Sequence, residues 1–235
     1  MEHEKNFLTS IEMPPIARIQ SPYQQRFGTP RQPHLNRLIE SVIQFPESFS
    51  PSFFQGLELI SHIWVIFVFD RSIGRGRSDR STVKPPRAGG KRFGVFATRS
   101  PDRPNPIGLS LVRVLEVNPQ KRCVVVEGGD WVDGTPVLDI KPYHKDADTP
   151  LGEVRDWWSA LETDLHWEIK WAPSIEDPQG FSRVQVEAAL REDPRPLGQR
   201  VAGDKIFGFL FQGWNVRFRF LEELRMIEVV EIQKP

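Results

Sequence analysis

The sequence is poor in cysteine and in long hydrophobic runs. Among its 235 residues the single cysteine is Cys123, so no intramolecular disulfide can form, and its place in the apolar run CVVV predicts a buried, inert thiol. The longest apolar run, Ile63–Phe69, is far too short to span a bilayer. The first residues, MEHEKNFLTS, lack the apolar core of a signal peptide. Together these absences predict a cytoplasmic protein.

Several motifs for common chemistries are also missing. The histidines are scattered without metal-ligand spacing, so we expect no metal site. No Gly-x-Gly-x-x-Gly follows a strand pattern, which argues against a Rossmann sheet, and neither a P-loop nor a Gly-x-Ser-x-Gly elbow occurs. The formal net charge is zero, so the whole molecule is not a basic nucleic-acid binder.

Proline-rich loops that carry arginine are what the sequence does contain. The stretch 93–117 reads as two apolar strands joined by the loop TRSPDRPNPIG. Its prolines restrict the backbone, so Arg99, Arg103 and Asn105 are presented from a stiff support. The loop is either a rigid connection with solvated arginines or part of a ligand site. The same arrangement of arginine between prolines recurs at PRQP, residues 30–33, and at PRP, residues 194–196.

A basic segment precedes that stretch. Residues 71–92 contain eight lysines or arginines and one acidic residue, Asp79. Such a local excess on a Gly/Ser-rich loop favours contact with nucleic-acid phosphates, although a solvated loop is the alternative.

The remaining pattern indicates a mainly β protein with two units. His62–Phe69 is rich in β-branched and aromatic residues, apolar on both faces, and is predicted to lie at the centre of a sheet or barrel. Asp139 lies in the short strand Val137–Ile140, where a carboxylate needs an ion pair or a ligand. We expect a catalytic β domain over residues 1–150, a linker over 151–165, and a small α+β domain over 166–235. The last would contain a helix at Ser182–Arg191, capped by Ser182, and three strands.

Four segments resemble the TsaA family, whose bacterial members methylate N6 of threonylcarbamoyl-adenosine beside the tRNA anticodon. They are SPY…FGTPRQP (21–33), GLE…SHIW (56–64), GVFATRSP…RPNPIG (94–108) and DGTPVLDIKPY (133–143). Their number and order make the resemblance specific, and the DPRP at 193–196 extends it into the second unit.

The resemblance implies a small antiparallel β-barrel that binds S-adenosylmethionine without a Rossmann sheet and acts as a homodimer on tRNA. Carried over by position, the implied cofactor residues are Pro30, Arg31, Gln32, Asp70, Arg71, Arg99, Leu109, Asp133, Gly134, Thr135, Pro136 and Asp139. The candidates for accepting the N6 proton are Asp139, Asp133 and His144, with no choice made among them.

The RNA contacts are expected from the basic segment and its neighbours. They comprise Arg75, Arg77, Arg80, Lys84, Arg87, Lys91, Arg92, Arg103 and Arg195. Two other functions remain open at this point: an RNA-binding module without catalysis, and a methyltransferase for another small substrate on the same barrel.

Overall fold

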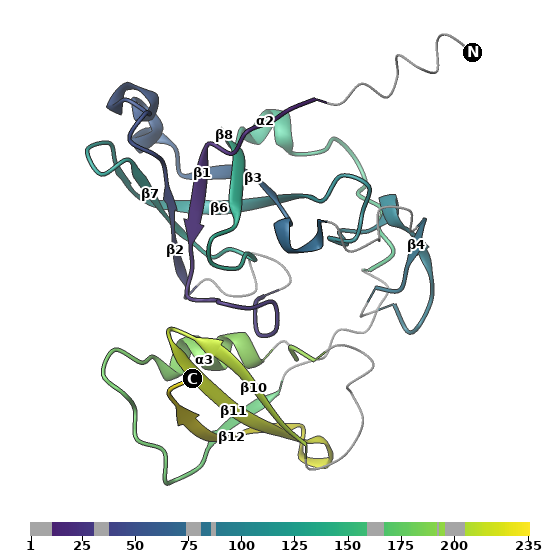
Figure 1. The fold of residues 1–235 in the computed structure, drawn as a ribbon. Coiled ribbons are helices and arrows are strands. Elements are labelled where there is room, and N and C mark those ends of the chain that lie inside the picture. The colour runs from purple at the N-terminus through teal and green to yellow at the C-terminus, as the bar shows by residue number, and fades with distance from the viewer. Residues whose placement is uncertain are drawn as a thin grey trace.

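A closed six-stranded barrel forms the larger part of the computed structural model, which describes residues 11–30, 38–73, 81–85, 88–158, 167–191, 193–195 and 205–235. Every neighbouring pair of barrel strands is antiparallel. In spatial order the strands are β1 (Ala17–Gln20), β2 (Glu40–Gln44), β7 (Cys123–Glu127), β6 (Ile107–Asn118), β3 (His62–Val68) and β8 (Pro136–Pro142). The predicted antiparallel β-barrel is therefore confirmed (Figure 1).

Strand β3 is the centre of the barrel wall that carries the pocket described below. It pairs with β6 on one side and β8 on the other. Ile63, Val65 and Phe67 are buried in the barrel core, while the alternate residues are only partly buried. The expected central position is correct, but its burial alternates, as usual for a strand with one face on a core.

Proline and glycine limit the regular elements in the first third of the chain. Strand β1 begins only at Ala17, after Pro14 and Pro15, which lack the N–H groups that a strand ladder needs. Between β2 and β3 lie two 3-10 turns, η2 (Pro51–Phe54) and η3 (Leu57–Leu59), separated by Gly56 with φ of +84°. Cys123 is buried, as predicted.

The apolar run Phe93–Ala97 does not pair with the strand that follows the proline loop. Only Phe93–Gly94 is extended, as β5, and it pairs with β4 (Thr82–Val83), while Val95–Ala97 forms the 3-10 turn η5. The stretch 93–117 therefore begins with a strand of the small two-stranded sheet β4-β5, and β6 is the only barrel strand within this stretch.

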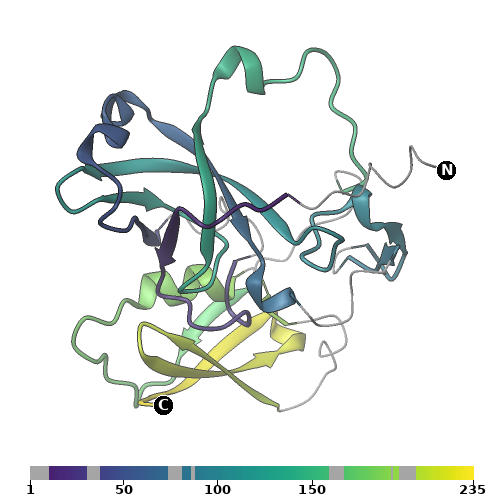
Figure 2. The same cartoon turned by 45° about the horizontal axis from the view of Figure 1, so that its top comes forward.

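The C-terminal unit, residues 167–235, is a small α+β structure. Its sheet has the order β10-β11-β12-β9, formed by Ile206–Phe211, Trp214–Leu221, Met226–Gln233 and Glu168–Trp171. Helix α3 (Arg183–Leu190) lies between this sheet and the barrel (Figures 1 and 2). Ser182 occupies the N-cap position of α3 without a side-chain capping hydrogen bond, contrary to expectation.

Three short elements complete the described chain: the single-turn α2 (Lys145–Asp148) after β8, and the 3-10 turns η4 (Asp70–Ser72) after β3 and η7 (Glu222–Leu224) before β12. Among the described residues, no helix is long and apolar enough to cross a membrane.

Candidate functional site

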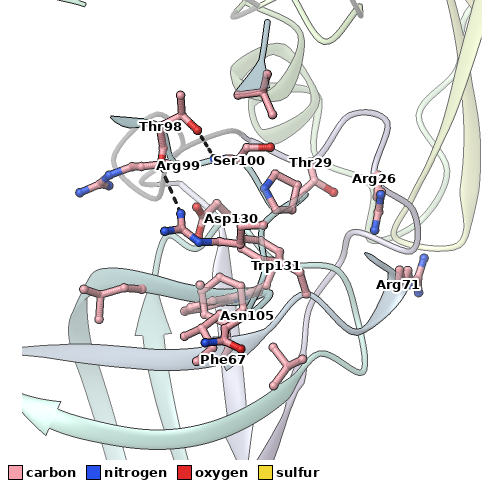
Figure 3. A pocket seen from close by; sticks show the side chains of 18 of the residues that line it. Arg26, Thr29, Phe67, Arg71, Thr98, Arg99, Ser100, Asn105, Asp130 and Trp131 are labelled. Atoms are coloured by element: carbon pink, nitrogen blue, oxygen red, sulfur yellow. Dashed lines mark hydrogen bonds between the residues drawn. The ribbon is translucent and has the colours of Figure 1, made fainter. Parts of the chain in front are cut away.

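A large pocket opens where β3 ends. Its volume is about 1400 Å³, larger than the roughly 300–1,000 Å³ of typical small-molecule sites. The wall combines the end of β3 with η4, the proline loop 98–106, the start of β6, the loop 130–135 after β7, and residues 26–30. Figure 3 shows side chains from these segments converging on one space, which offers room for more than one small ligand.

The proline loop is held by hydrogen bonds among its own residues. Thr98 is buried and its hydroxyl donates to Val95 O at 2.8 Å, while its carbonyl accepts from Arg103 Nη1 at 3.1 Å. The loop then joins β3, because Phe69 N donates to Pro106 O at 2.7 Å. The predicted stiffness thus has a second source besides proline.

At the start of β6 the backbone lies directly on an aromatic ring. A Cβ added to Gly108 would come within 2.2 Å of Phe67 Cζ, so only glycine allows this approach. Leu109 and Ile107, on either side, expose 51% and 41% of their surface and line the pocket. This part of the wall is therefore apolar and accessible.

Asp130 is a carboxylate of the pocket lining whose side chain accepts a hydrogen bond from the barrel wall. Its Oδ1 accepts a hydrogen bond of 2.5 Å from Ser110 Oγ on β6. Burial raises the pKa of Asp130 from 3.8 to about 6, and this effect is only partly offset by the Ser110 hydrogen bond, its own backbone N–H and the positive charge of Arg99. A carboxylate near this pKa is ionised at neutral pH and is a stronger base than an ordinary aspartate.

Aromatic side chains also line the pocket, and we call Phe96, Trp157 and Trp158 the aromatic rim. Trp157 stacks on Phe93 with ring centroids 4.3 Å apart, and its Nε1 donates to Ala97 O at 2.8 Å. This contact fixes Trp158, which packs edge-on against Trp157 and still exposes 49% of its surface. Phe96, 80% exposed, completes the rim.

The structure brings half of the implied cofactor residues together in this pocket. Its lining includes Pro30, Asp70, Arg71, Arg99, Leu109 and Thr135. Gly134, Pro136, Asp133 and Asp139 do not belong to that lining. Arg31 and Gln32 lie outside the described residues.

The three predicted proton acceptors lie elsewhere. Asp133 Oδ1 accepts the backbone N–H of Ser21 at 3.0 Å, which ties down the loop that follows β1. Asp139 Oδ1 accepts the N–H of Ile140 within β8, and His144 is the exposed N-cap of α2. None of the three lines the pocket.

Of the predicted RNA contacts, Lys84 and Arg103 line the pocket, and Lys91 and Arg92 are exposed beyond it. Arg75, Arg77, Arg80 and Arg87 lie outside the described residues.

The role predicted for Arg195 is wrong, because its side chain is 2% exposed. It is paired with Asp193 and Glu222, and its guanidinium lies 3.3 Å from the centroid of Phe220. It stabilises the C-terminal unit.

Comparison with known proteins identifies the family. The family model described as tRNA-methyltransferase O N-terminal domain matches residues 18–149. The chain belongs to the tRNA-methyltransferase O family. It is 36% identical over 230 residues to the tRNA (adenine(37)-N6)-methyltransferase of Escherichia coli, covering 90% of this chain and 94% of that protein. It is 32% identical to a putative S-adenosylmethionine-dependent methyltransferase of Pseudomonas aeruginosa, covering 88% and 91% of the two chains.

Solved structures of the family agree with the fold. The crystal structure of TrmO from P. aeruginosa superimposes with a TM-score of 0.74 at 27% identity, covering 97% of this chain and 99% of that one. A second TrmO crystal structure gives a TM-score of 0.72 at 25% identity, with 96% and 100% coverage. The resemblance seen in the sequence motifs is thus confirmed.

The match to the N-terminal domain model covers only part of the site. Matched residues 18–149 include Asp130, Arg99 and the proline loop. Trp157 and Trp158 lie beyond the match, in the stretch expected to be a linker. Sequence reasoning missed both Trp residues and Asp130. The available signal for Asp130 was its place between Gly129 and the apolar Trp131, but a carboxylate after two glycines is also typical of a turn.

Proposed function

We propose that this protein transfers a methyl group from S-adenosylmethionine to N6 of adenosine 37 in tRNA, and that the adenosine carries the threonylcarbamoyl group. Relatives named as tRNA (adenine(37)-N6)-methyltransferases support the reaction, since one of them matches over nine-tenths of this chain. The observation that carries the proposal is the pocket: a partly buried carboxylate with a raised pKa, Asp130, lines the same space as Arg99 and an apolar wall.

The pocket suits S-adenosylmethionine by the chemistry of its lining. Arg99 offers a planar guanidinium for the methionyl carboxylate, and Asp70 is an exposed carboxylate available to the ammonium group or the ribose hydroxyls. Leu109, half-exposed beside Gly108, offers apolar contact for adenine. A relative named as a probable S-adenosyl-L-methionine-binding protein, from Methanothermobacter thermautotrophicus, is 38% identical over 140 residues, covering 59% of this chain and 94% of that protein.

The reaction requires the protein mainly to position the two substrates and to accept a proton. The cofactor supplies a methyl group already activated by the sulfonium charge. The proline loop and β6 fix the geometry of the site, which lowers the entropic part of the barrier. The N6 nitrogen loses a proton as it gains the methyl group, and Asp130 is the carboxylate in the pocket suited to accept it. Ser110 holds that carboxylate in one orientation.

The RNA enters from the rim. Trp158 and Phe96 expose aromatic surface on which a base splayed from the anticodon loop can stack, as single-stranded bases do on RNA-binding proteins. Lys84 and Arg103 add positive charge at the same opening, for phosphates or for the threonyl carboxylate. We further infer that the protein acts as a homodimer in the cytoplasm, where mature tRNA is modified.

Methylation of a synthetic anticodon stem-loop tests the proposal. We expect transfer of one methyl group to a stem-loop carrying threonylcarbamoyl-adenosine, and little transfer to the same RNA with plain adenosine. Equal transfer to both RNAs would refute the substrate. Absence of S-adenosylmethionine binding in calorimetry would leave only an RNA-binding module, and methylation of small molecules alone would favour a different methyltransferase.

A further inference from the structure

The loop Ser21–Pro30, which we call loop 21–30, connects the pocket to the C-terminal unit. Arg26, Thr29 and Pro30 line the pocket. The preceding part of the loop is embedded in the core of the C-terminal unit rather than in the barrel core. One loop therefore belongs to both structures.

On the side of the C-terminal unit the contacts are aromatic and close. Tyr23 is 1% exposed, forms an isolated β-bridge with Phe211, and packs edge-on against its ring at 5.5 Å. Phe27 stacks on Phe207 and on Phe218, each with centroids 6.2 Å apart. These contacts bury the apolar side chains of the loop in a sheet formed some 180 residues later in the chain.

Gly28 makes the closest approach. Its φ is +88°, and a Cβ placed there would come within 2.4 Å of Phe209 Cδ2. Phe209 is fully buried in the C-terminal core and cannot move aside cheaply. The position of residues 29 and 30 at the pocket therefore depends on this fit.

On the barrel side hydrogen bonds hold the same loop. Asp133 N donates to Tyr23 O at 2.7 Å, and Arg71 Nη1 donates to Gln24 O at 3.0 Å. Arg26 Nη2 donates to Ser72 Oγ at 2.7 Å, and Figure 3 shows Arg26 and Arg71 together at one side of the pocket. The barrel supplies polar contacts, and the C-terminal unit supplies the apolar ones.

The chain returns to the C-terminal unit a few residues later. Ile39 is buried in that same core, and Gln185 Nε2 on α3 donates to Leu38 O at 2.9 Å. Both described stretches that flank the implied cofactor residues Arg31 and Gln32 are thus attached to the C-terminal unit. The match to the family's N-terminal domain model ends at residue 149, so this support comes from residues beyond that match.

We propose that the C-terminal unit sets the cofactor affinity of the barrel by holding loop 21–30 in place, with Tyr23, Phe27, Gly28 and Phe209 as positioning residues. The inference rests on the proposed function, because it takes the pocket to bind S-adenosylmethionine. It assigns to the C-terminal unit a role beyond contact with tRNA. Ordering the loop in advance removes an entropy cost that binding would otherwise include.

Two matched pairs of variants test this. Gly28→Ala is compared with Gly56→Ala, since Gly56 has nearly the same φ, +84°, but no atom within 4 Å of an added Cβ. Phe27→Ala is compared with Phe181→Ala, because both rings are partly buried against the same core and only Phe27 belongs to the loop. Calorimetry with S-adenosylmethionine measures affinity, and thermal unfolding followed by circular dichroism measures folding.

We expect Gly28→Ala and Phe27→Ala to weaken cofactor binding by about tenfold or more, and the two controls to stay within about twofold. Folded loop variants that bind as tightly as their controls, or controls that weaken binding equally, would overturn the inference. If Gly28→Ala does not fold, the Phe27 pair decides. Failure of the wild-type protein to bind S-adenosylmethionine would instead refute the proposed function.

Discussion

Ser110 and Asp130 join the first half of β6 to the loop after β7 through a hydrogen bond of 2.5 Å. Ser110 is itself 1% exposed, so its hydroxyl is shielded from bulk solvent. The pair places one carboxylate oxygen in a fixed position while the pocket keeps the group poorly solvated. This is the arrangement expected of a carboxylate that must take a proton at neutral pH.

Replacement of the carboxylate tests that role. Asp130→Asn keeps the shape and the acceptor for Ser110 but removes the base, so kcat should fall by about 100-fold or more. Affinity for S-adenosylmethionine should change little, which stopped-flow or calorimetry can separate from kcat. Because the pKa of Asp130 is raised from 3.8 to about 6, ionising it costs folding free energy that grows between these two pH values and stays constant above about 6, so Asp130→Asn should not lower stability at pH 7.

Asp139→Asn is the matched control for that variant. Asp139 Oδ1 accepts a hydrogen bond from the N–H of Ile140 within β8, and Asp139 lies outside the pocket lining. We expect near wild-type kcat. A large loss of kcat in Asp139→Asn with full activity in Asp130→Asn would reverse the assignment.

The pH profile follows from the same group. The base form of Asp130 is the active one, so log(kcat/KM) should rise with unit slope below about pH 6 and level off above it. An ordinary aspartate would place the bend near its usual value of 3.8. The inflection should disappear from the residual activity of Asp130→Asn, and its persistence there would show that another group titrates.

The aromatic rim predicts a separation of RNA binding from cofactor binding. Trp158→Ala should weaken binding of the modified stem-loop by about tenfold or more, because a base stacked on an aromatic ring contributes roughly 1–3 kcal/mol. Trp158→Phe should recover part of the loss, and the affinity for S-adenosylmethionine should stay unchanged. Phe53→Ala, which removes a 70% exposed ring on η2 outside the pocket lining, is the control. Equal RNA affinity in Trp158→Ala and wild type would remove the rim from the substrate site.

Arg195 predicts an effect on stability. Arg195→Ala leaves Asp193, 1% exposed, without the guanidinium that pairs with it, and should cost about 3–5 kcal/mol of unfolding free energy. Denaturant unfolding measures this directly. A fully stable Arg195→Ala protein with weakened tRNA binding would restore the surface role that the sequence suggested.

Residue types and spacing were enough to predict those elements whose own sequence determines their structure. Strand β3, the proline loop and the helix at Arg183–Leu190 follow from residue types and spacing. The prediction that Phe93–Ala97 pairs with the strand after the proline loop was wrong. The pairing of β5 with β4, rather than with β6, depends on tertiary contacts that the local sequence does not encode. Prolines beside arginine look alike in sequence, yet Arg99 lines a pocket and Arg195 is buried with Glu222, 27 residues away.

Residues of the site were predictable only where they belong to a sequence motif of the family. Arg99, Leu109 and Asp70 came from the family resemblance and lie in the pocket lining. Asp130 could not be chosen over Asp133 or Asp139, because its distinction is burial and a partner on β6, 20 residues earlier. Trp158 was taken as linker because its position depends on the stacking of Trp157 on Phe93.

The central claim is most directly tested in cells that lack their own enzyme for this methylation. Nucleosides from the tRNA of such a strain, analysed by mass spectrometry, should gain one methyl group on threonylcarbamoyl-adenosine when this protein is expressed. They should not gain it when Asp130→Asn is expressed at the same level. No methylation with the wild-type protein, or undiminished methylation with the variant, would contradict the account.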